Sequence, residues 1–219
     1  MILLIDNYDS FSYNLYQLVC SVYLEHRHLQ VKDEELDAHI RVIRNDEMTI
    51  EQIRALKPEA IILSPGPGKP QDAGVCIKVV TELAGTMPIM GVCLGHQAIC
   101  EAYDEEAVRT VTATDTGGVV SYAPQLMHGK TSQAKLDNNS RLFKSMPQEI
   151  QIARYHSLIA RKDRLPQELT ITAETSVGEI MAVEHREYPV YGLQFHPESI
   201  LTPDGRQIMK NFMEVIDND

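Results

Sequence analysis

Basic side chains are scarce in this sequence. There are 20 lysines and arginines against 31 aspartates and glutamates, so the formal net charge is −11 over 219 residues. A surface of that sign repels phosphate backbones and anionic lipid headgroups. We therefore expect an acidic, soluble protein with neither a nucleic-acid partner nor a membrane partner.

Long apolar runs are also missing. No stretch approaches the ~20 apolar residues that a transmembrane helix requires. Residues 1–6 lack the basic segment and the small-residue cleavage site of a secretory signal. Neither an internal repeat nor a low-complexity linker is present, so we expect a cytoplasmic protein with a single domain over residues 1–219.

Cysteines are few, and none is spaced for metal binding. The four are Cys20, Cys76, Cys93 and Cys100, without a Cys-x-x-Cys pair. A chain of this length does not need a disulfide scaffold. We expect four free thiols, three of them structural, and neither a metal nor a cofactor bound by this chain.

The first hundred residues alternate buried strands with amphipathic helices. Apolar runs at 2–5, 40–44, 60–63 and 89–92 predict strands, and apolar residues at helical spacing follow each of them. Thr49, with Gln52 three residues later, predicts a capping box that opens a short helix. Such alternation is typical of an α/β fold with a parallel sheet, helices on both faces, and its site beyond the carboxyl ends of the strands.

After about residue 107 the pattern becomes rich in strands. We predict strands at 108–114, 119–122, 149–153, 169–173, 180–183 and 190–195, which together suggest an antiparallel extension. Pro203 at a first-turn position, followed by Ile208 and Phe212, predicts a final amphipathic helix. The predicted fold class is thus an open, mostly parallel α/β sheet with a strand-rich antiparallel extension.

The cysteine at position 93 has the surroundings of a nucleophile. A buried strand at 89–92 precedes it, an apolar helical stripe at 98–102 follows it, and Gly91 and Gly95 bracket it. Glycines at these two positions let the backbones approach closely at a sharp turn from strand to helix. The N–H groups of the first helical turn favour the thiolate. The alternative is a buried structural cysteine.

A base for this nucleophile lies near the end of the predicted strand at 190–195. Because Pro197 disfavours helical backbone at His196, we expect extended chain that places His196 and Glu198 on one side. A carboxylate beside an imidazole fixes its tautomer and stabilises the imidazolium. The result is a predicted triad with Cys93, the alternative being an ordinary surface turn.

Acyl transfer also requires donors for an oxyanion. One is the backbone N–H of Leu94, directly after the nucleophile. A second is expected from Gly68, at the end of a neighbouring parallel strand. A phosphate-binding role suits this loop less well, because Pro65 and Pro67 remove two of its amides.

These residues resemble the class I glutamine amidotransferases, which have a flavodoxin-like fold and a Cys-His-Glu triad. More narrowly, the sequence is similar to the glutaminase subunits of anthranilate synthase and aminodeoxychorismate synthase. The resemblance rests on six blocks that span nearly the whole chain: Asp6 to Phe11, Ser64 to Gly68, Gly91 to Gln97, Met127 to Lys130, Tyr155 to Leu158 and Phe195 to Ser199.

The resemblance implies that glutamine is hydrolysed through a thioester on Cys93, and that ammonia passes to a chorismate-binding synthase subunit. Gln97 and the backbone around Ser157 and Leu158 would hold the amino-acid end of glutamine, with His128 as a further binding residue. Gly68 and Leu94 would form the oxyanion hole. A Mg-dependent chorismate site is expected on the partner subunit.

Several points remain open from the sequence. The pathway is either tryptophan or folate synthesis, or one subunit serves both. Two other interpretations are a cysteine hydrolase that acts without a partner and a regulatory binding module. Two stretches at about 23–39 and 104–116 depart from the family pattern as insertions, the second with a predicted hairpin at 108–113. The histidines of the first (His26, His28 and His39) are more typical of a solvated segment than of a metal site.

Overall fold

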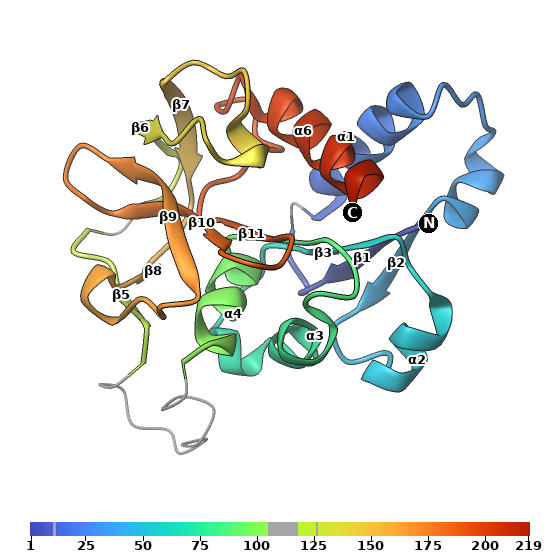
Figure 1. Cartoon of the computed structure of the whole chain (residues 1–219), viewed down its shortest axis with the longest axis horizontal. Coiled ribbons are helices and arrows are strands. Elements are labelled where there is room, and N and C mark those ends of the chain that lie inside the picture. Colours follow the sequence, from blue (N-terminus) through green and yellow to red (C-terminus); the bar gives the residue numbers. More distant parts are fainter. Residues whose placement is uncertain (11, 105–117, 126) are drawn as a thin grey trace.

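A nine-stranded mixed sheet forms the centre of the molecule in this computed structural model, which describes residues 1–10, 12–104, 118–125 and 127–219 (Figure 1). Its strand order is β2-β1-β3-β4-β11-β10-β9-β6-β7, and β5 and β8 form a separate two-stranded sheet. The predicted strand at 108–114 and the predicted hairpin lie outside the described residues.

The first five strands in that order are parallel. The sequence predicts this for the four strands within the first hundred residues. The strand near 190–195 was expected in the antiparallel extension, and that expectation is wrong because it pairs parallel with β4. They are β1 (Ile2–Asp6), β2 (Ile40–Arg44), β3 (Ala60–Leu63), β4 (Ile89–Val92) and β11 (Val190–Leu193). The helices are α1 (Ser12–His26), α2 (Ile50–Leu56), α3 (Cys76–Leu83), α4 (Leu94–Ala102) and α6 (Gly205–Asn218). The described residues also form four short 3-10 helices: η1 (Asp33–Ala38), η2 (Pro70–Asp72), η3 (Arg141–Phe143) and η4 (Lys162–Arg164).

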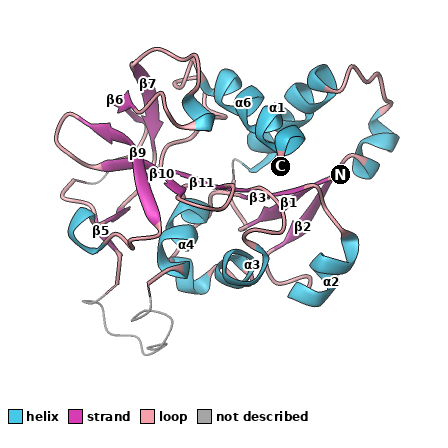
Figure 2. Cartoon of the chain, in the orientation of Figure 1, coloured by secondary structure: helices cyan, strands magenta, loops and turns pink. Residues whose placement is uncertain are grey.

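Helices cover both faces of the parallel strands, which explains why these strands read as continuous apolar runs. Leu4 belongs to the core under α1 and α6, whereas its neighbour Leu3 belongs to the core under α2, α3 and α4. Figure 2 shows the two helical layers on opposite sides of the sheet. Thr49 and Gln52 form the predicted capping box at the start of α2.

The antiparallel extension is confirmed, and it continues the same sheet. β10 (Ile180–His185), β9 (Leu169–Thr175), β6 (Lys130–Leu136) and β7 (Glu149–Arg154) follow β11 edge to edge, each pair antiparallel. The short strands β5 (Val120–Tyr122) and β8 (Leu158–Ala160) pair with each other. The sequence missed β6 because only Ala134 and Leu136 of its seven residues are buried, and it missed β8 because that strand is only three residues long.

Several predicted strands extend one or two residues further, such as β9 and β10, and two other boundaries differ near the predicted triad. β11 ends at Leu193, because the chain leaves the sheet before the buried Phe195. The last helix begins at Gly205 after the N-cap Asp204, not at Pro203. A Cβ on Gly205 would lie 1.9 Å from the Pro197 carbonyl oxygen, so close packing at this point requires glycine.

The polar stretch at 23–39 is folded onto the rest of the chain. Its first residues complete α1, and His26 Nε2 lies 2.7 Å from a carboxylate oxygen of Asp217 on α6. Arg27 pairs with the same carboxylate at 2.5 Å. These contacts join the end of α1 to the end of α6.

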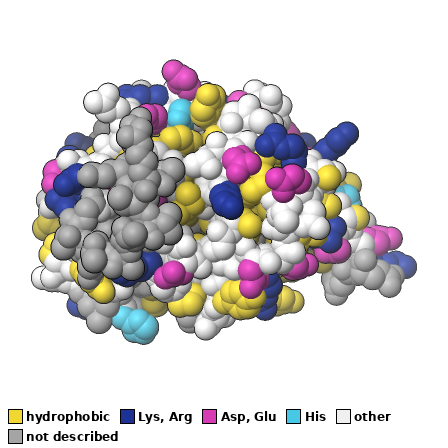
Figure 3. Space-filling view, turned by 90° about the horizontal axis from the view of Figure 1, so that it is seen from below, with side chains coloured by type: hydrophobic (Ala, Val, Ile, Leu, Met, Phe, Trp, Pro, Cys, Tyr) yellow, Lys and Arg dark blue, Asp and Glu magenta, His cyan; other side chains and the backbone are white. Residues whose placement is uncertain are grey.

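The described surface agrees with the composition. On the face shown in Figure 3, acidic and basic side chains are interspersed, with no broad basic patch among the described residues. No described helix has the length and apolar character needed to cross a membrane.

Candidate active site

Cys93 occupies the turn between β4 and α4, with φ 51° and ψ −101°. Left-handed backbone is costly for a residue with a side chain, and such outliers persist only where the surroundings enforce them. A Cβ on Gly91 would lie 2.4 Å from the Gly95 carbonyl, and one on Gly95 would lie 2.4 Å from the Leu63 carbonyl oxygen. The predicted turn with two obligatory glycines is therefore confirmed.

His196 and Glu198 lie together after β11. His196 Nδ1 is 2.7 Å from Glu198 Oε1, and both side chains are buried. The expected contact is present, but the expected extended chain is not. Residues 197 and 198 form a turn in which the Ser199 N–H donates to the His196 carbonyl at 3.3 Å.

The environment of His196 favours its charged form. Burial alone lowers the pKa of His196, but hydrogen bonding and charge from Cys93 and Glu198 outweigh burial and hold the pKa well above its ordinary value. With Nδ1–H donated to Glu198, Nε2 is the ring nitrogen that remains to interact with the Cys93 thiol. The imidazole can therefore exchange a proton at Nε2, and the thiol of Cys93 is close enough to perturb it.

Gln194 joins the nucleophile to Gln97, which the sequence analysis did not anticipate. Gln194 is fully buried, and its Nε2 donates to Cys93 Sγ at 3.7 Å. Its Oε1 accepts from Gln97 Nε2 at 3.1 Å. Gln97 is itself 3% exposed, so this side chain is committed to internal contacts. The signal available in the sequence for Gln194 was a polar amide in an otherwise apolar predicted strand, two residues before the predicted base.

Buried side chains hold the segment around Ser157 and Leu158 in place. The Leu158 carbonyl accepts from Gln97 Nε2 at 3.1 Å and lies 3.0 Å from His156 Nδ1. Because His156 Nε2 accepts from Arg154 Nε at 3.1 Å, the proton of this imidazole must be on Nδ1. Ser157 is exposed at the top of the segment. Ser157 thus lies in the loop between β7 and β8, and Leu158 is the first residue of β8, where Gln97 and His156 hold its carbonyl.

Arg154 anchors this loop from within the core. Its side chain is 2% exposed, and it donates to Ser132 Oγ at 3.1 Å and to Glu179 Oε2 at 2.7 Å. Burial, followed by the charge of Arg154, lowers the pKa of His156 to about 4. His156 is therefore neutral near pH 7, in contrast to His196.

An aromatic residue connects the two histidine-bearing loops. The Tyr155 ring lies edge-on to His196 at 5.2 Å between centroids. His128, which is exposed, also lies edge-on to Tyr155, at 6.0 Å. Tyr155 is thus in contact with both His128 and the triad histidine.

The two predicted oxyanion donors come from adjacent elements. Leu94 is the first residue of α4 and is 2% exposed. Gly68 lies in the loop after β3, is exposed, and has φ +85°. Gly66 makes the close contact between the two elements, because a Cβ there would lie 2.9 Å from Leu94 Cδ2.

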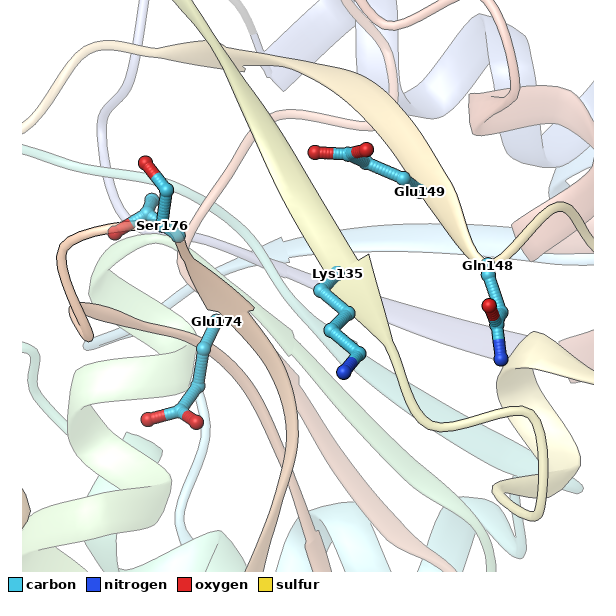
Figure 4. A pocket seen from close by; sticks show the side chains of 6 residues that line it. Lys135, Gln148, Glu149, Glu174 and Ser176 are labelled. Carbon is cyan, nitrogen blue, oxygen red and sulfur yellow. The ribbon is translucent and has the colours of Figure 1, made fainter.

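Two surface hollows lie apart from these residues. The larger, about 440 Å³, is lined by Lys135, Gln148, Glu149, Glu174, Thr175 and Ser176. Figure 4 shows Lys135 between carboxylates of neighbouring strands. Glu174 also pairs with Lys162 at 2.6 Å. The smaller hollow, about 260 Å³, lies between α6 and the Arg141 region. Neither hollow includes a triad residue.

No group of three or more potential metal ligands is present among the described residues.

The chain matches known proteins over almost its whole length. The model of the family "Glutamine amidotransferase class-I" matches residues 3–216. Anthranilate synthase component 2 of Methanothermobacter thermautotrophicus is 45% identical over 218 residues, covering 98% of this chain and 99% of the relative. Aminodeoxychorismate synthase component 2 of Escherichia coli is 43% identical over 213 residues, covering 97% of this chain and 99% of the relative.

Other similar proteins differ in length or in sequence. The chain spans only 32% of the bifunctional protein TrpGD of Thermotoga maritima, with 42% identity and 99% of this chain covered. A crystal structure from Thermoplasma acidophilum, described as that of a GMP synthase subunit, superposes with a TM-score of 0.74. It is 21% identical and covers 99% of this chain and 94% of its own, so it supports the fold alone. The match to the family model and the identity of the relatives together place this chain in the class I glutamine amidotransferase family.

Proposed function

We propose that the chain is the glutaminase subunit of anthranilate synthase, hydrolysing glutamine and passing ammonia to a chorismate-aminating synthase subunit. The observation that carries the proposal is the geometry at Cys93. A strained turn at the start of a helix presents the thiol beside a buried His196–Glu198 pair. Family membership selects glutamine as the acyl donor among the substrates that such a site could attack.

The first half of the reaction forms a thioester. The Cys93 thiolate attacks the side-chain amide carbon of glutamine, and the carbonyl electrons move onto oxygen. The N–H groups of Leu94 and Gly68 stabilise this oxyanion. When the intermediate collapses, the C–N bond breaks and His196 gives its Nε2 proton to the departing nitrogen, releasing ammonia. Glu198 keeps the imidazole oriented throughout.

The second half restores the enzyme. His196, now neutral, takes a proton from water, and the resulting hydroxide attacks the thioester carbon. The C–S bond breaks, glutamate leaves, and Cys93 regains the thiolate paired with the imidazolium. The exposed loop at Ser157 and Leu158 holds the amino-acid end of glutamine, and His128 contributes from its edge. Gln97 supports the binding of the amino-acid end of glutamine indirectly, because it donates a hydrogen bond to the Leu158 carbonyl.

The alternative is the amidotransferase subunit of aminodeoxychorismate synthase, or a subunit shared by both synthases. A Bacillus subtilis relative, 42% identical over 214 residues, is named for both complexes, which supports the shared role as the second candidate. Neither role requires a cofactor on this chain. We place the complex in the cytoplasm and the Mg-dependent chorismate site on the partner subunit.

The decisive experiment uses Cys93→Ser in a complex with each candidate synthase subunit. Glutamine-dependent synthesis should fall by at least about 10³-fold, because the serine hydroxyl is a far weaker nucleophile here. Synthesis from added ammonium salts should be unchanged. If a folded, partner-bound variant loses both activities, the proposal is wrong. If the wild-type chain hydrolyses glutamine equally well without any synthase and binds none, the partner-free hydrolase is correct instead.

A further inference from the structure

Asn7 lies in a buried polar cluster that the proposed reaction does not use. It is 2% exposed and follows β1 directly. Its Oδ1 accepts from Asn45 Nδ2 at 2.9 Å and from Cys76 Sγ at 3.2 Å. Its Nδ2 donates to the Ser64 carbonyl at 2.8 Å, and its backbone N–H donates to Ser64 Oγ at 2.8 Å. Every polar group of the side chain is therefore engaged, and two contacts converge on Ser64.

Ser64 begins the loop that carries Gly68. The Ser64 N–H still bonds to the Ile5 carbonyl at 2.9 Å, which is the last sheet contact on this strand. Beyond it, Pro65 and Pro67 have no N–H to donate. The position of the loop therefore depends on side-chain contacts and packing rather than on a backbone ladder.

Gly66 packs against both Asn7 and the nucleophile helix. A Cβ on Gly66 would lie 2.5 Å from Asn7 Cβ and 2.9 Å from Leu94 Cδ2. The loop is thus in close contact with Asn7 and with the first residue of α4 at the same point.

We propose that Asn7 is a positioning residue, which fixes the loop of residues 64–68 against Leu94 so that the two oxyanion donors keep their spacing. This inference rests on the proposed function, since it assigns Asn7 a part in glutamine hydrolysis. Oxyanion stabilisation depends on donors placed within a few tenths of an ångström, so a displaced loop lowers the rate of acylation without altering the thiol.

The test compares two reactions of Cys93 in the full chain bound to its synthase subunit. Acylation by glutamine passes through an oxyanion, whereas alkylation by iodoacetamide displaces iodide at a saturated carbon and needs only the thiolate. Asn7→Ala should lower kcat for glutamine hydrolysis by roughly 10- to 100-fold, part of the 10²–10³ that one oxyanion donor contributes. The alkylation rate, followed by mass spectrometry of the Cys93 peptide, should stay within about twofold.

Asn211→Ala is the matched control. Asn211 is 4% exposed on α6 and donates through Nδ2 to the Leu142 carbonyl at 2.8 Å and the Lys144 carbonyl at 3.0 Å. This variant loses comparable hydrogen bonds away from the site, so its Tm should fall while kcat stays within about twofold. Asn7→Asp keeps the side-chain shape but removes the donor to Ser64, and it should show the same loss of kcat if Asn7→Ala does not fold.

Three results overturn the inference. One is kcat within about twofold of wild type in a folded Asn7 variant. Another is an equal loss of kcat in the Asn211 control, which indicates general destabilisation. The third is an equal loss of alkylation, which places the effect on the nucleophile. The proposed function is judged separately by whether the wild-type chain hydrolyses glutamine and Cys93→Ser does not.

Discussion

The two halves of the central sheet contribute different things to the site. The parallel half supplies the groups proposed to carry out the chemistry, since Cys93 follows β4, Gly68 follows β3, and His196 and Glu198 follow β11. The antiparallel half supplies the groups proposed to hold the substrate, in the segment after β7. The carboxyl ends of adjacent parallel strands meet at one edge, which brings the reacting groups together.

The contrast is clearest in the two buried histidines. His196 faces a thiol and a carboxylate, and its pKa is raised despite burial. His156 is buried and faces the Arg154 guanidinium, and burial, followed by that charge, lowers its pKa to about 4. The same side chain is therefore charged in the half that moves protons and neutral in the half that fixes a loop.

His196→Asn should have the largest effect. It removes the group that carries the proton between Cys93, the leaving nitrogen and water, so kcat for glutamine hydrolysis should fall by about 10³-fold or more. The KM for glutamine should change by less than about threefold, because the hydrogen bonds from Gln97 and His156 to the Leu158 carbonyl do not involve the His196 side chain. Steady-state kinetics on the complex measures both quantities. A large rise in KM with little loss of kcat would contradict the division between the two halves.

The pH dependence of stability tests the neutral state of His156. Its folded pKa of about 4 lies below the ordinary value of 6.5, so between these values the unfolded chain binds a proton that the folded chain does not. Stability should therefore fall as pH drops through this window, by up to about 3 kcal/mol from His156 alone.

Comparison with His156→Gln isolates this contribution. The variant lacks the titrating group, whereas His96, also buried with a pKa lowered to about 3, and His196, whose raised pKa acts in the opposite direction, remain in both proteins. Urea unfolding at steps from pH 7 to pH 4 should give a shallower loss of unfolding free energy in the variant. Parallel curves would mean that His156 is not held neutral.

The parallel half was also the easier half to predict. Its strands are buried on both faces, so 2–5 and 60–63 stand out as apolar runs, and the glycines around Cys93 mark the turn by themselves. The His196–Glu198 contact joins residues two apart in the chain, so the right pair was found even though the backbone geometry was wrong.

The antiparallel half could not be predicted in the same way. β6 is largely exposed and carries no apolar signal. The Arg154–Glu179 pair joins residues 25 apart through a sheet whose strand order the sequence does not reveal. Gln194 lay inside the predicted strand and acquires its role only because β11 lies beside β4. Local patterns thus indicated the reacting groups, and tertiary pairing determined what supports them.

Arg154→Lys should give the smallest of these effects, and it tests the role of the antiparallel half in substrate binding most directly. Lysine keeps the buried charge near Glu179 but cannot also donate to His156 and Ser132 in the fixed directions of a guanidinium. The loop at Leu158 then loses support, and the KM for glutamine should rise about tenfold, which is about 1.4 kcal/mol of binding. Because Cys93 and His196 keep their own contacts, kcat should stay within about threefold.

Arg141→Lys serves as the matched control for that variant. Arg141 also pairs with a carboxylate, Asp219 at 3.1 Å, but it is half-exposed, and from η3 it contacts the C-terminal end of α6. It should leave both KM and kcat unchanged. If Arg154→Lys lowers kcat as strongly as it raises KM, the antiparallel half takes part in the chemical step. The division of the sheet into a half that reacts and a half that holds the substrate is then wrong.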